Sequence, residues 1–332
     1  MESEKIEINI GDELKISLIL ETNSLLSEIR KKLLDEIDIS FKFGDKYKTK
    51  IPKEKESEIK LKDILDGTNL YLIKRVMLGK KIESRNELDF YLYPQRKLTE
   101  EEKASSLNIM VAGEPGSGKS TWLNSFLNYL QEIQLEENDR YYLFDEKKLL
   151  DFYNKPIIYN IEPNKLINKP IRLIDTPGFD SIRGLDDGKK MIEDIRNLFQ
   201  NSEIENVNAI CFFFIANRRR VMYRYIPIIL SLFKKEIINN IIIICTFTDN
   251  FKDIPCLKEI KNKDGPFAQM FEDINDIPYF AFDNSAYFNN DKESMEKIYE
   301  NNTNNFRNFL LYASSLNRVS LYKQKNLIKN DN

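Results

Sequence analysis

The stretch "IMVAGEPGSGKSTWLNSF", residues 109–126, decides the fold of this chain. It runs from an apolar, strand-like segment through a glycine-rich loop into a segment with helical apolar spacing. The part from Gly113 to Ser120 satisfies G-x-x-x-x-G-K-[ST], a motif that binds phosphate where it connects a strand to a helix. Because the flanking segments meet this requirement, the sequence predicts a phosphate-binding loop.

The glycines of this loop allow the backbone to curl until successive amides point at one anion, and the helix N-terminus adds partial positive charge. Lys119 supplies a point charge for the β- and γ-phosphates, and the Ser120 hydroxyl is expected to ligate Mg²⁺. Pro115 has no amide hydrogen, which removes one donor. The residues predicted to hold the phosphates are Gly113, Glu114, Gly116, Ser117, Gly118, Lys119, Ser120 and Thr121.

A second phosphate element is the segment "IRLIDTPGFD", residues 171–180. Asp175 ends an apolar strand and is predicted to hold Mg²⁺ through a water molecule, while the amide of Gly178 is predicted to meet a γ-phosphate. Ligands of open α/β sheets bind at the carboxyl ends of the strands. Two phosphate motifs at neighbouring strand ends therefore support each other.

Base recognition is assigned to two later segments. Proteins that bind GTP carry [NT]-K-x-D after a strand, and the corresponding residues here include Thr246 and Asp249, with Phe247 in place of the lysine. An aromatic ring can stack on a purine, so this replacement is compatible with base binding. The segment "FDNSAYF" places Ser285 and Ala286 where such proteins contact the guanine oxygen.

Composition and charge exclude several classes of function. The 332 residues carry 50 basic and 53 acidic side chains, and the net charge of -3 gives no overall attraction to nucleic acid or anionic lipid. The chain has no histidine, which removes every Ser-His or Cys-His mechanism. Cys211 and Cys245 lie in apolar runs and are expected to be buried thiols in a reducing compartment. With no signal peptide and no apolar run of ~20 residues, we expect a cytoplasmic protein without a transmembrane segment.

Two domains are expected. Residues 1–76 read as strands around one helix, in an order similar to the β-grasp fold of ubiquitin-like domains, and residues 77–105 read as a polar linker with one strand in "DFYLY". Residues 106–318 alternate apolar strands with helices, which predicts an α/β domain with a mostly parallel sheet covered by helices on both faces. Trp122 is expected in its core, and residues 319–332 are expected to form a frayed tail.

The phosphate loop, together with "YPQRKLTEEE", "IRLIDTPGFDSIRGLDDGKKM" and "FDNSAYF", resembles the septin-like and immunity-associated (AIG1/GIMAP-like) branch of the TRAFAC P-loop GTPases. The resemblance covers residues 93–288 and leaves out the first domain. It implies a Ras-like P-loop G domain with one antiparallel strand. It also implies GTP or GDP with Mg²⁺ as ligands and self-association through the G-domain face.

The sequence departs from this family at positions that bear on hydrolysis. The family has a Mg²⁺-binding threonine between its phosphate motifs, whereas the segment between Trp122 and Asp175 has none and offers Tyr153 or Asn154 instead. Phe179 stands where Ras-like enzymes have the water-orienting glutamine.

A run of three arginines follows the fourth strand of the α/β domain, and it is the one candidate for a catalytic group. An arginine offered across a dimer interface could neutralise charge on a neighbour's phosphates. The alternative is a solvated basic turn. The run consists of Arg218, Arg219 and Arg220.

Three functions fit the sequence. The first is a GTP-binding switch protein with slow or dimer-dependent hydrolysis to GDP and phosphate. The second is a degenerate, non-hydrolysing GTPase that acts as an adaptor through a protein partner of the β-grasp domain. The third is an ATP-using P-loop protein, although the carboxylate of Asp249 would face an acceptor nitrogen of adenine.

Overall fold

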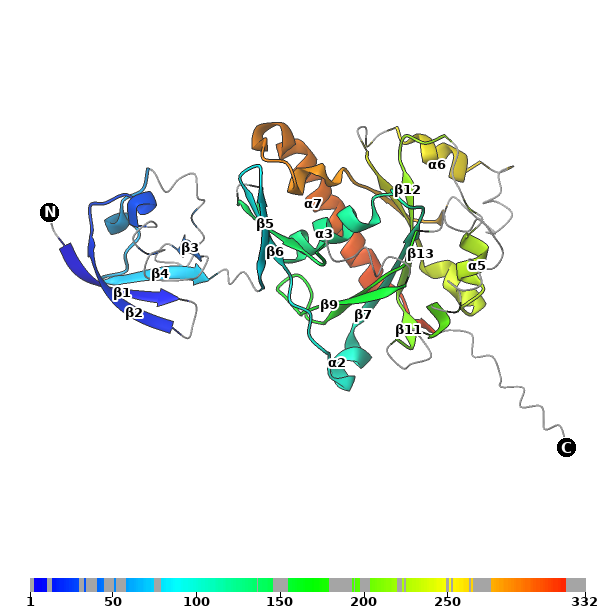
Figure 1. Cartoon of the computed structure of the whole chain (residues 1–332), viewed down its shortest axis with the longest axis horizontal. Helices are drawn as coiled ribbons and strands as arrows, with labels where there is room; N and C mark the ends of the chain where they lie inside the picture. Colours follow the sequence, from blue (N-terminus) through cyan, green and yellow to red (C-terminus); the bar gives the residue numbers. More distant parts are fainter. Residues whose placement is uncertain are drawn as a thin grey trace. The chain divides into compact units, whose positions relative to one another are not determined.

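The computed structural model of the chain describes residues 3–10, 14–29, 33, 41–44, 51, 58–74, 79–135, 137–145, 155–178, 193, 195–197, 204–219, 223, 225–248, 251, 253–262, 264 and 276–320. The chain divides into two compact units (Figure 1). The first comprises Met1–Tyr91 and Glu136–Asp139, and the second comprises Leu92–Leu135 and Arg140–Asn332. The domain boundaries expected from the sequence stay a prediction.

The first unit contains a four-stranded sheet in the order β2-β1-β4-β3. Its strands are β1 (Ser3–Ile10), β2 (Leu14–Glu21), β3 (Phe41–Gly44) and β4 (Asn69–Lys74). β1 pairs antiparallel with β2 and parallel with β4. Ile6 and Ile8 of β1 are buried with Leu26 and Ile29 of a helical segment, and the short helix η2 (Leu61–Asp63) contributes Leu61 to the same core. The β-grasp assignment stays a prediction.

A second hairpin lies in the segment predicted to be a linker with one strand. It joins β5 (Lys81–Arg85) to β6 (Leu88–Leu92) through Asn86 and Glu87. These two residues have φ values of 50° and 61°, so both are left-handed, as in a two-residue type I′ turn. β5 has no buried residue, and without an alternating apolar pattern it gave no strand signal in the sequence.

The helix α2 (Glu100–Ser105) follows this hairpin and begins with a capping box. The Thr99 hydroxyl accepts a hydrogen bond from the Glu102 amide, and the Glu102 carboxylate accepts one from the Thr99 amide. This reciprocal pair satisfies two backbone donors at the helix start.

The second unit is built on a six-stranded sheet in the order β14-β13-β12-β7-β10-β9. All neighbours are parallel except β9, which runs antiparallel to β10. The expected α/β class is therefore confirmed, including one antiparallel strand. The strands are β7 (Leu107–Gly113), β9 (Ile157–Ile161), β10 (Ile171–Asp175), β12 (Ala209–Ile215), β13 (Ile241–Thr246) and β14 (Tyr279–Ala281). The short strands outside this sheet are β8 (Asp139–Tyr142), β11 (Asn206–Val207) and β15 (Val319–Ser320).

Helices cover both faces of this sheet. On one face, α3 (Lys119–Leu130) and α7 (Lys292–Ser315) lie side by side (Figure 1). Trp122 packs between Phe213 of β12 and Phe309 of α7. Trp122 is fully buried, as expected. On the other face lie α5 (Ile226–Leu230) and α6 (Pro255–Ile260), whose apolar residues share a core with β12 and β13.

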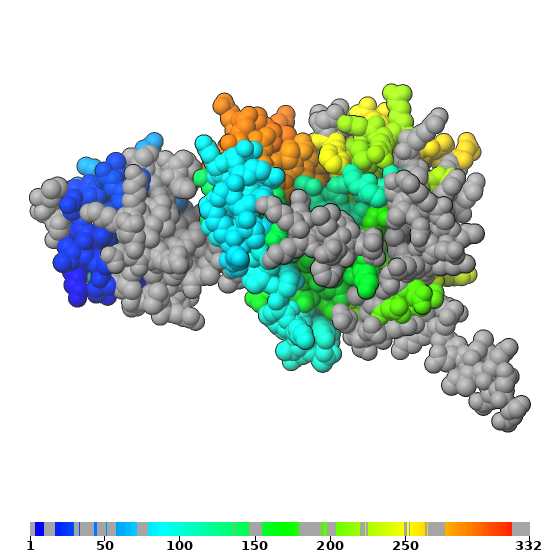
Figure 2. All heavy atoms as spheres, viewed as in Figure 1, coloured from blue at the N-terminus to red at the C-terminus, as the bar shows by residue number. Residues whose placement is uncertain are grey.

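Two short helices and one exposed segment complete the second unit. The short helices are η5 (Lys235–Asn240) and η7 (Asn284–Tyr287). The first turns of α7 are mostly exposed and form part of the surface (orange in Figure 2). In the part of the chain that the structure describes, no helix has the length and apolarity to cross a membrane.

Candidate phosphate-binding site

The glycine-rich loop leaves β7 and closes into α3, and its glycines are required for different reasons. Gly116 and Gly118 have φ values of 70° and 82°, a left-handed conformation that side chains rarely adopt. Gly113 lies too close to β12 for a side chain, because a Cβ there would be 2.8 Å from the Ser117 hydroxyl and 2.9 Å from the Cβ of Phe213. A side chain would therefore be strained by the backbone conformation at Gly116 and Gly118, and would clash with its neighbours at Gly113.

Lys119 is the first residue of α3, and its side chain turns back over the loop. Its Nζ donates to the carbonyl oxygens of Gly113 and Glu114, at 2.9 and 3.0 Å, and the residue is 8% exposed. Burial lowers the pKa of Lys119 to about 8, against the opposing influence of Asp175 and Glu114. The loop thus holds a nearly buried cation. Ser120 and Thr121 follow it in the first turn of α3.

Asp175 ends β10, beside β7, where it pairs in register with Val111. Its Oδ1 is buried and has no hydrogen-bond partner among the described residues, and the same holds for the Ser117 hydroxyl. Burial raises the pKa of Asp175 to about 6, and Lys119 opposes that rise. Buried polar atoms without partners are costly. A carboxylate oxygen and a hydroxyl left open beside a cation suit a metal ion with its phosphate ligands, so the residues present fit Mg²⁺ and a polyphosphate.

The two phosphate motifs are in direct contact. A Cβ added at Gly178 would lie 2.7 Å from the backbone nitrogen of Pro115 and 2.6 Å from its Cγ. The chain therefore brings together the segments that the sequence predicted to share a γ-phosphate, and glycine is the residue that allows them to approach.

The end of β13 adjoins the same loop. The Thr246 hydroxyl donates to the Ser117 carbonyl at 2.7 Å, which ties the end of the strand to the loop backbone. Phe247 follows with a left-handed φ of 54° and 54% of its surface exposed. A Cβ at Gly118 would lie 3.2 Å from the Cε2 atom of the Phe247 ring, so the ring lies beside the loop.

The second segment assigned to the base is η7, which follows β14. Ser285 is exposed and its amide donates to the Asp283 carboxylate at 3.1 Å, while Ala286 is buried. The carbonyl of Tyr287 accepts a hydrogen bond from the buried guanidinium of Arg140, at 2.6 Å. This contact fixes the end of η7, and sequence reasoning missed it because the two residues are far apart in the chain.

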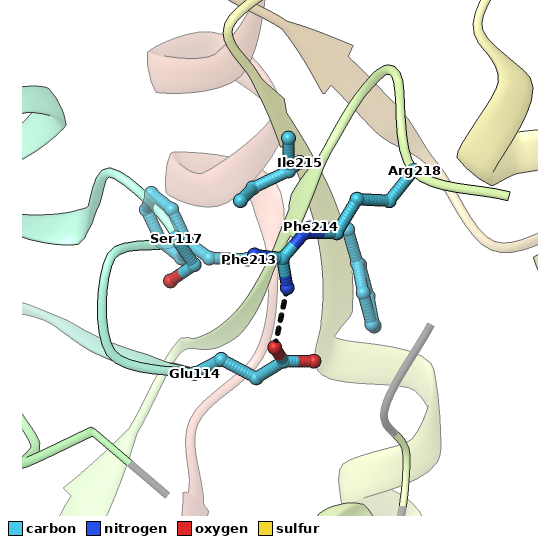
Figure 3. Close-up of a pocket in the computed structure, with 6 residues that line it drawn as sticks. All are labelled: Glu114, Ser117, Phe213, Phe214, Ile215 and Arg218. Carbon is cyan, nitrogen blue, oxygen red and sulfur yellow. Dashed lines mark hydrogen bonds and ion pairs between the residues drawn. The ribbon is translucent and has the colours of Figure 1, made fainter. Parts of the chain in front are cut away.

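Arg218 forms an ion pair with the phosphate loop of its own chain. Its Nη1 lies 2.7 Å from Oε2 of Glu114, and the pair lines a small pocket together with Ser117, Phe213, Phe214 and Ile215 (Figure 3). The Arg218 side chain is 51% exposed and that of Glu114 is 15% exposed. The sequence gave no sign of this pair, because nothing local links an acid to a base that lies a hundred positions further on.

Some residues to which the sequence assigned a role lie outside the described residues. They are Tyr153, Asn154, Phe179, Arg220 and Asp249.

The second unit is thus a P-loop α/β domain with the architecture of a G domain. It combines a mostly parallel sheet, a G-x-x-x-x-G-K-S loop between β7 and α3, a carboxylate at the end of the neighbouring strand, and one antiparallel strand beyond it.

Comparisons with known proteins give no family assignment. No family model matches the sequence, and no curated protein is significantly similar to it. Among solved structures, the chain is similar to Toc33 from Arabidopsis thaliana in complex with Mg²⁺ and GMPPNP, with 16% identity, a TM-score of 0.42, and coverage of 65% of this chain and 88% of that one. It is also similar to the G domain of the T. maritima FeoB iron transporter, with 15% identity, a TM-score of 0.28, and coverage of 59% and 99%. These values are low, so the function has to be argued from the chain's own residues.

Proposed function

We propose that the second unit binds GTP with Mg²⁺ and works as a nucleotide-dependent switch with slow or dimer-dependent hydrolysis. The observation that carries this proposal is the pairing of a nearly buried lysine with an open carboxylate oxygen at one end of the sheet. The Lys119 ammonium is held by loop carbonyls, and Oδ1 of Asp175 has no partner among the described residues. Such a cation and acceptor, beside a helix N-terminus, suit a polyphosphate and its metal ion.

Each residue of the site then has a role. The loop amides and Lys119 would bind the phosphates, Ser120 would ligate Mg²⁺, and Asp175 would hold it through water. The metal would supply charge neutralisation on the phosphate oxygens. Gly178, which abuts the loop at Pro115, would respond to the terminal phosphate.

Guanine is the base that the sequence favours. The carboxylate of Asp249 would accept from the guanine N–H groups, while Thr246, Ser285 and Ala286 would flank the base. Thr246 is bonded to the loop, which supports this arrangement.

A degenerate GTPase that serves as an adaptor is the second candidate. Two sequence features favour it, namely the missing threonine between the phosphate motifs and Phe247 in the lysine position. In that case the β-grasp-like unit would bind the protein partner and the nucleotide would have a structural role. An ATP-using protein is the third candidate.

Titration calorimetry separates these candidates. A non-hydrolysable GTP analogue, GDP and the matching ATP analogue are titrated with and without Mg²⁺. A switch requires Mg²⁺-dependent, guanine-selective binding that distinguishes the analogue from GDP. Lys119→Ala should abolish triphosphate binding, whereas Lys103→Ala on α2, before the start of β7, should leave it unchanged. Unchanged affinity in Lys119→Ala would refute the phosphate site.

Asp249 is tested in the same assay. Asp249→Asn should reduce the preference for GTP over ATP, because a charge-assisted hydrogen bond is worth ~1.5–3 kcal/mol. If the preference survives this substitution, another group reads the base.

A further inference from the structure

We propose that the ring of Phe247 is a stacking platform for the purine base, and that this contact supplies much of the affinity for the nucleoside. The inference rests on the proposed nucleotide site and adds to it the residue that holds the base and the class of base it selects. The ring would act through its π-face, which every purine can use.

The position of Phe247 follows from the arrangement of the strand ends. In the sheet order β13-β12-β7-β10, the phosphate loop leaves the middle, with Asp175 and Gly178 on the β10 side. A nucleotide whose terminal phosphate and metal face that side must extend its nucleoside in the opposite direction, toward β13. The end of β13 is bonded to the loop through Thr246, and Phe247 is the next residue.

The ring of Phe247 is in contact with the loop and is also exposed to solvent. One edge lies against Gly118, where a Cβ would be 3.2 Å from Cε2, so the missing side chain of Gly118 makes room for the ring. Yet 54% of Phe247 is exposed, which leaves aromatic surface open to solvent beside the loop. Base stacking requires exposed aromatic surface of this kind next to the phosphate site.

The backbone of Phe247 supports a functional role. Its φ of 54° is left-handed, which is rare for a bulky side chain and costs stability. Burial does not offset that cost, because more than half of the residue is exposed. Strain retained without gain in packing is typical of positions kept for binding.

The test compares two substitutions that relieve the same kind of strain. Phe247→Gly removes the ring and the left-handed strain, while Glu87→Gly removes only strain at the exposed turn between β5 and β6, where φ is 61°. Both should raise the melting temperature. Only Phe247→Gly should weaken binding of the GTP analogue, by roughly five- to a hundredfold given the measured range of base–aromatic stacking energies. Phe247→Tyr should retain wild-type affinity.

Inorganic tripolyphosphate with Mg²⁺, which has no base, separates the ring from the phosphate site. Its affinity should be the same in wild type and Phe247→Gly. If Phe247→Gly binds the GTP analogue as wild type does, the stacking role is overturned while the phosphate site stands. If Phe247→Gly weakens tripolyphosphate binding by the same factor as it weakens binding of the GTP analogue, the ring supports the loop and does not stack on the base, which also overturns the inference. If wild type binds neither probe, the nucleotide site itself is wrong and the inference falls with it.

A preference among bases completes the test. Because the platform recognises ring area, the ATP analogue should bind more tightly than the matching CTP analogue, and Phe247→Gly should remove that difference. An equal affinity of wild type for the ATP and CTP analogues would overturn the inference.

Discussion

Two buried residues of opposite charge, Lys119 and Asp175, lie in the phosphate-binding site. Burial lowers the pKa of Lys119 to about 8 and raises that of Asp175 to about 6, and each group partly offsets the shift of the other. Each charge is therefore kept at a cost in stability. A site that is to receive a polyanion and a cation needs that arrangement before they bind.

Asp175 should make stability depend on pH. Its pKa in the folded chain, about 6, exceeds the ordinary aspartate value of 3.8, so the folded state binds this proton more tightly than the unfolded state does. The resulting stabilisation is fully present below pH ~4 and is lost as the pH rises through ~6, by at most about 3 kcal/mol. Wild type therefore loses stability over this pH range and Asp175→Asn does not, so the stability of the variant relative to wild type should increase as the pH rises. Urea denaturation of both proteins without Mg²⁺ measures the difference, and a difference that does not change with pH would contradict the expectation.

The hydrogen bond from Thr246 to the phosphate loop should contribute both to stability and to phosphate binding. Thr246→Val keeps the shape but removes the hydroxyl that donates to Ser117, and the lost buried hydrogen bond should cost about 1–2 kcal/mol. Thr248→Val is the matched control, since its buried hydroxyl donates to the Cys245 carbonyl at 3.2 Å, away from the loop. Both variants should lose similar stability in urea, but only Thr246→Val should weaken tripolyphosphate binding in calorimetry. Equal binding by both would show that the bond does not order the loop.

Aromatic side chains pack α3 and α7 of the second unit against each other and against the sheet. Trp122 of α3 lies 5.3 Å from Phe213 of β12 and 5.1 Å from Phe309 of α7, measured between ring centroids. Phe309 also meets Phe280 of β14 at 5.6 Å. The helix that begins in the phosphate loop is thereby fixed against both the sheet and the last helix.

Removal of one of these rings should destabilise the second unit. Phe309→Ala removes a fully buried ring by which α7 contacts α3 and β14. The cavity left behind should lower the free energy of unfolding by about 3–5 kcal/mol. Leu311→Ala, two residues along the same helix, alters a side chain that is 64% exposed and should change stability by no more than about 0.5 kcal/mol. Urea denaturation followed by circular dichroism compares them. Similar losses would show that the aromatic contacts do not hold α7.

The ion pair between the loop after β12 and the phosphate loop is a weaker connection. Arg218 is half exposed, so its pairing with Glu114 should contribute less than ~1 kcal/mol. The pair matters for position more than for stability, because it holds the Arg218 side chain against the phosphate loop of its own chain.

At the scale of the whole molecule, each of the two units has its own buried core. Ile6, Ile8 and Leu26 belong to the core of the first unit, and Met110 and Phe212 belong to the main core of the second. Self-association through the second unit stays a proposal. Since Arg218 is paired within the chain, the exposed Arg219 is the better candidate for a contact to a neighbour's phosphates.

Arg219→Ala should slow GTP turnover only where the protein dimerises. Turnover per chain is measured over a dilution series, with sedimentation velocity to determine the fraction of dimer in the presence of the GTP analogue. Lys258→Ala, which alters an exposed lysine on α6, is the control and should match wild type at every concentration. An equal loss in dilute monomer would exclude a role across the interface.

Local patterns in the sequence determined most of the secondary structure around the phosphate loop. The glycine motif predicted the strand–loop–helix from β7 to α3, because left-handed glycines and a lysine at a helix start are local requirements. Apolar runs predicted the parallel sheet, since strands buried on both faces need no alternation. The hairpin of β5 and β6 was missed in part, because an exposed strand has no apolar signature.

Only the tertiary structure decided the rest of the site. The contact of Pro115 with Gly178, the bond from Thr246 to Ser117 and the pairing of Arg218 with Glu114 join residues far apart in the chain. No spacing in the sequence encodes such contacts, because they depend on which strands become neighbours in the sheet. The sequence thus determined that a phosphate loop exists. The strand order determined that Asp175 and Gly178 lie on one side of that loop and Phe247 on the other.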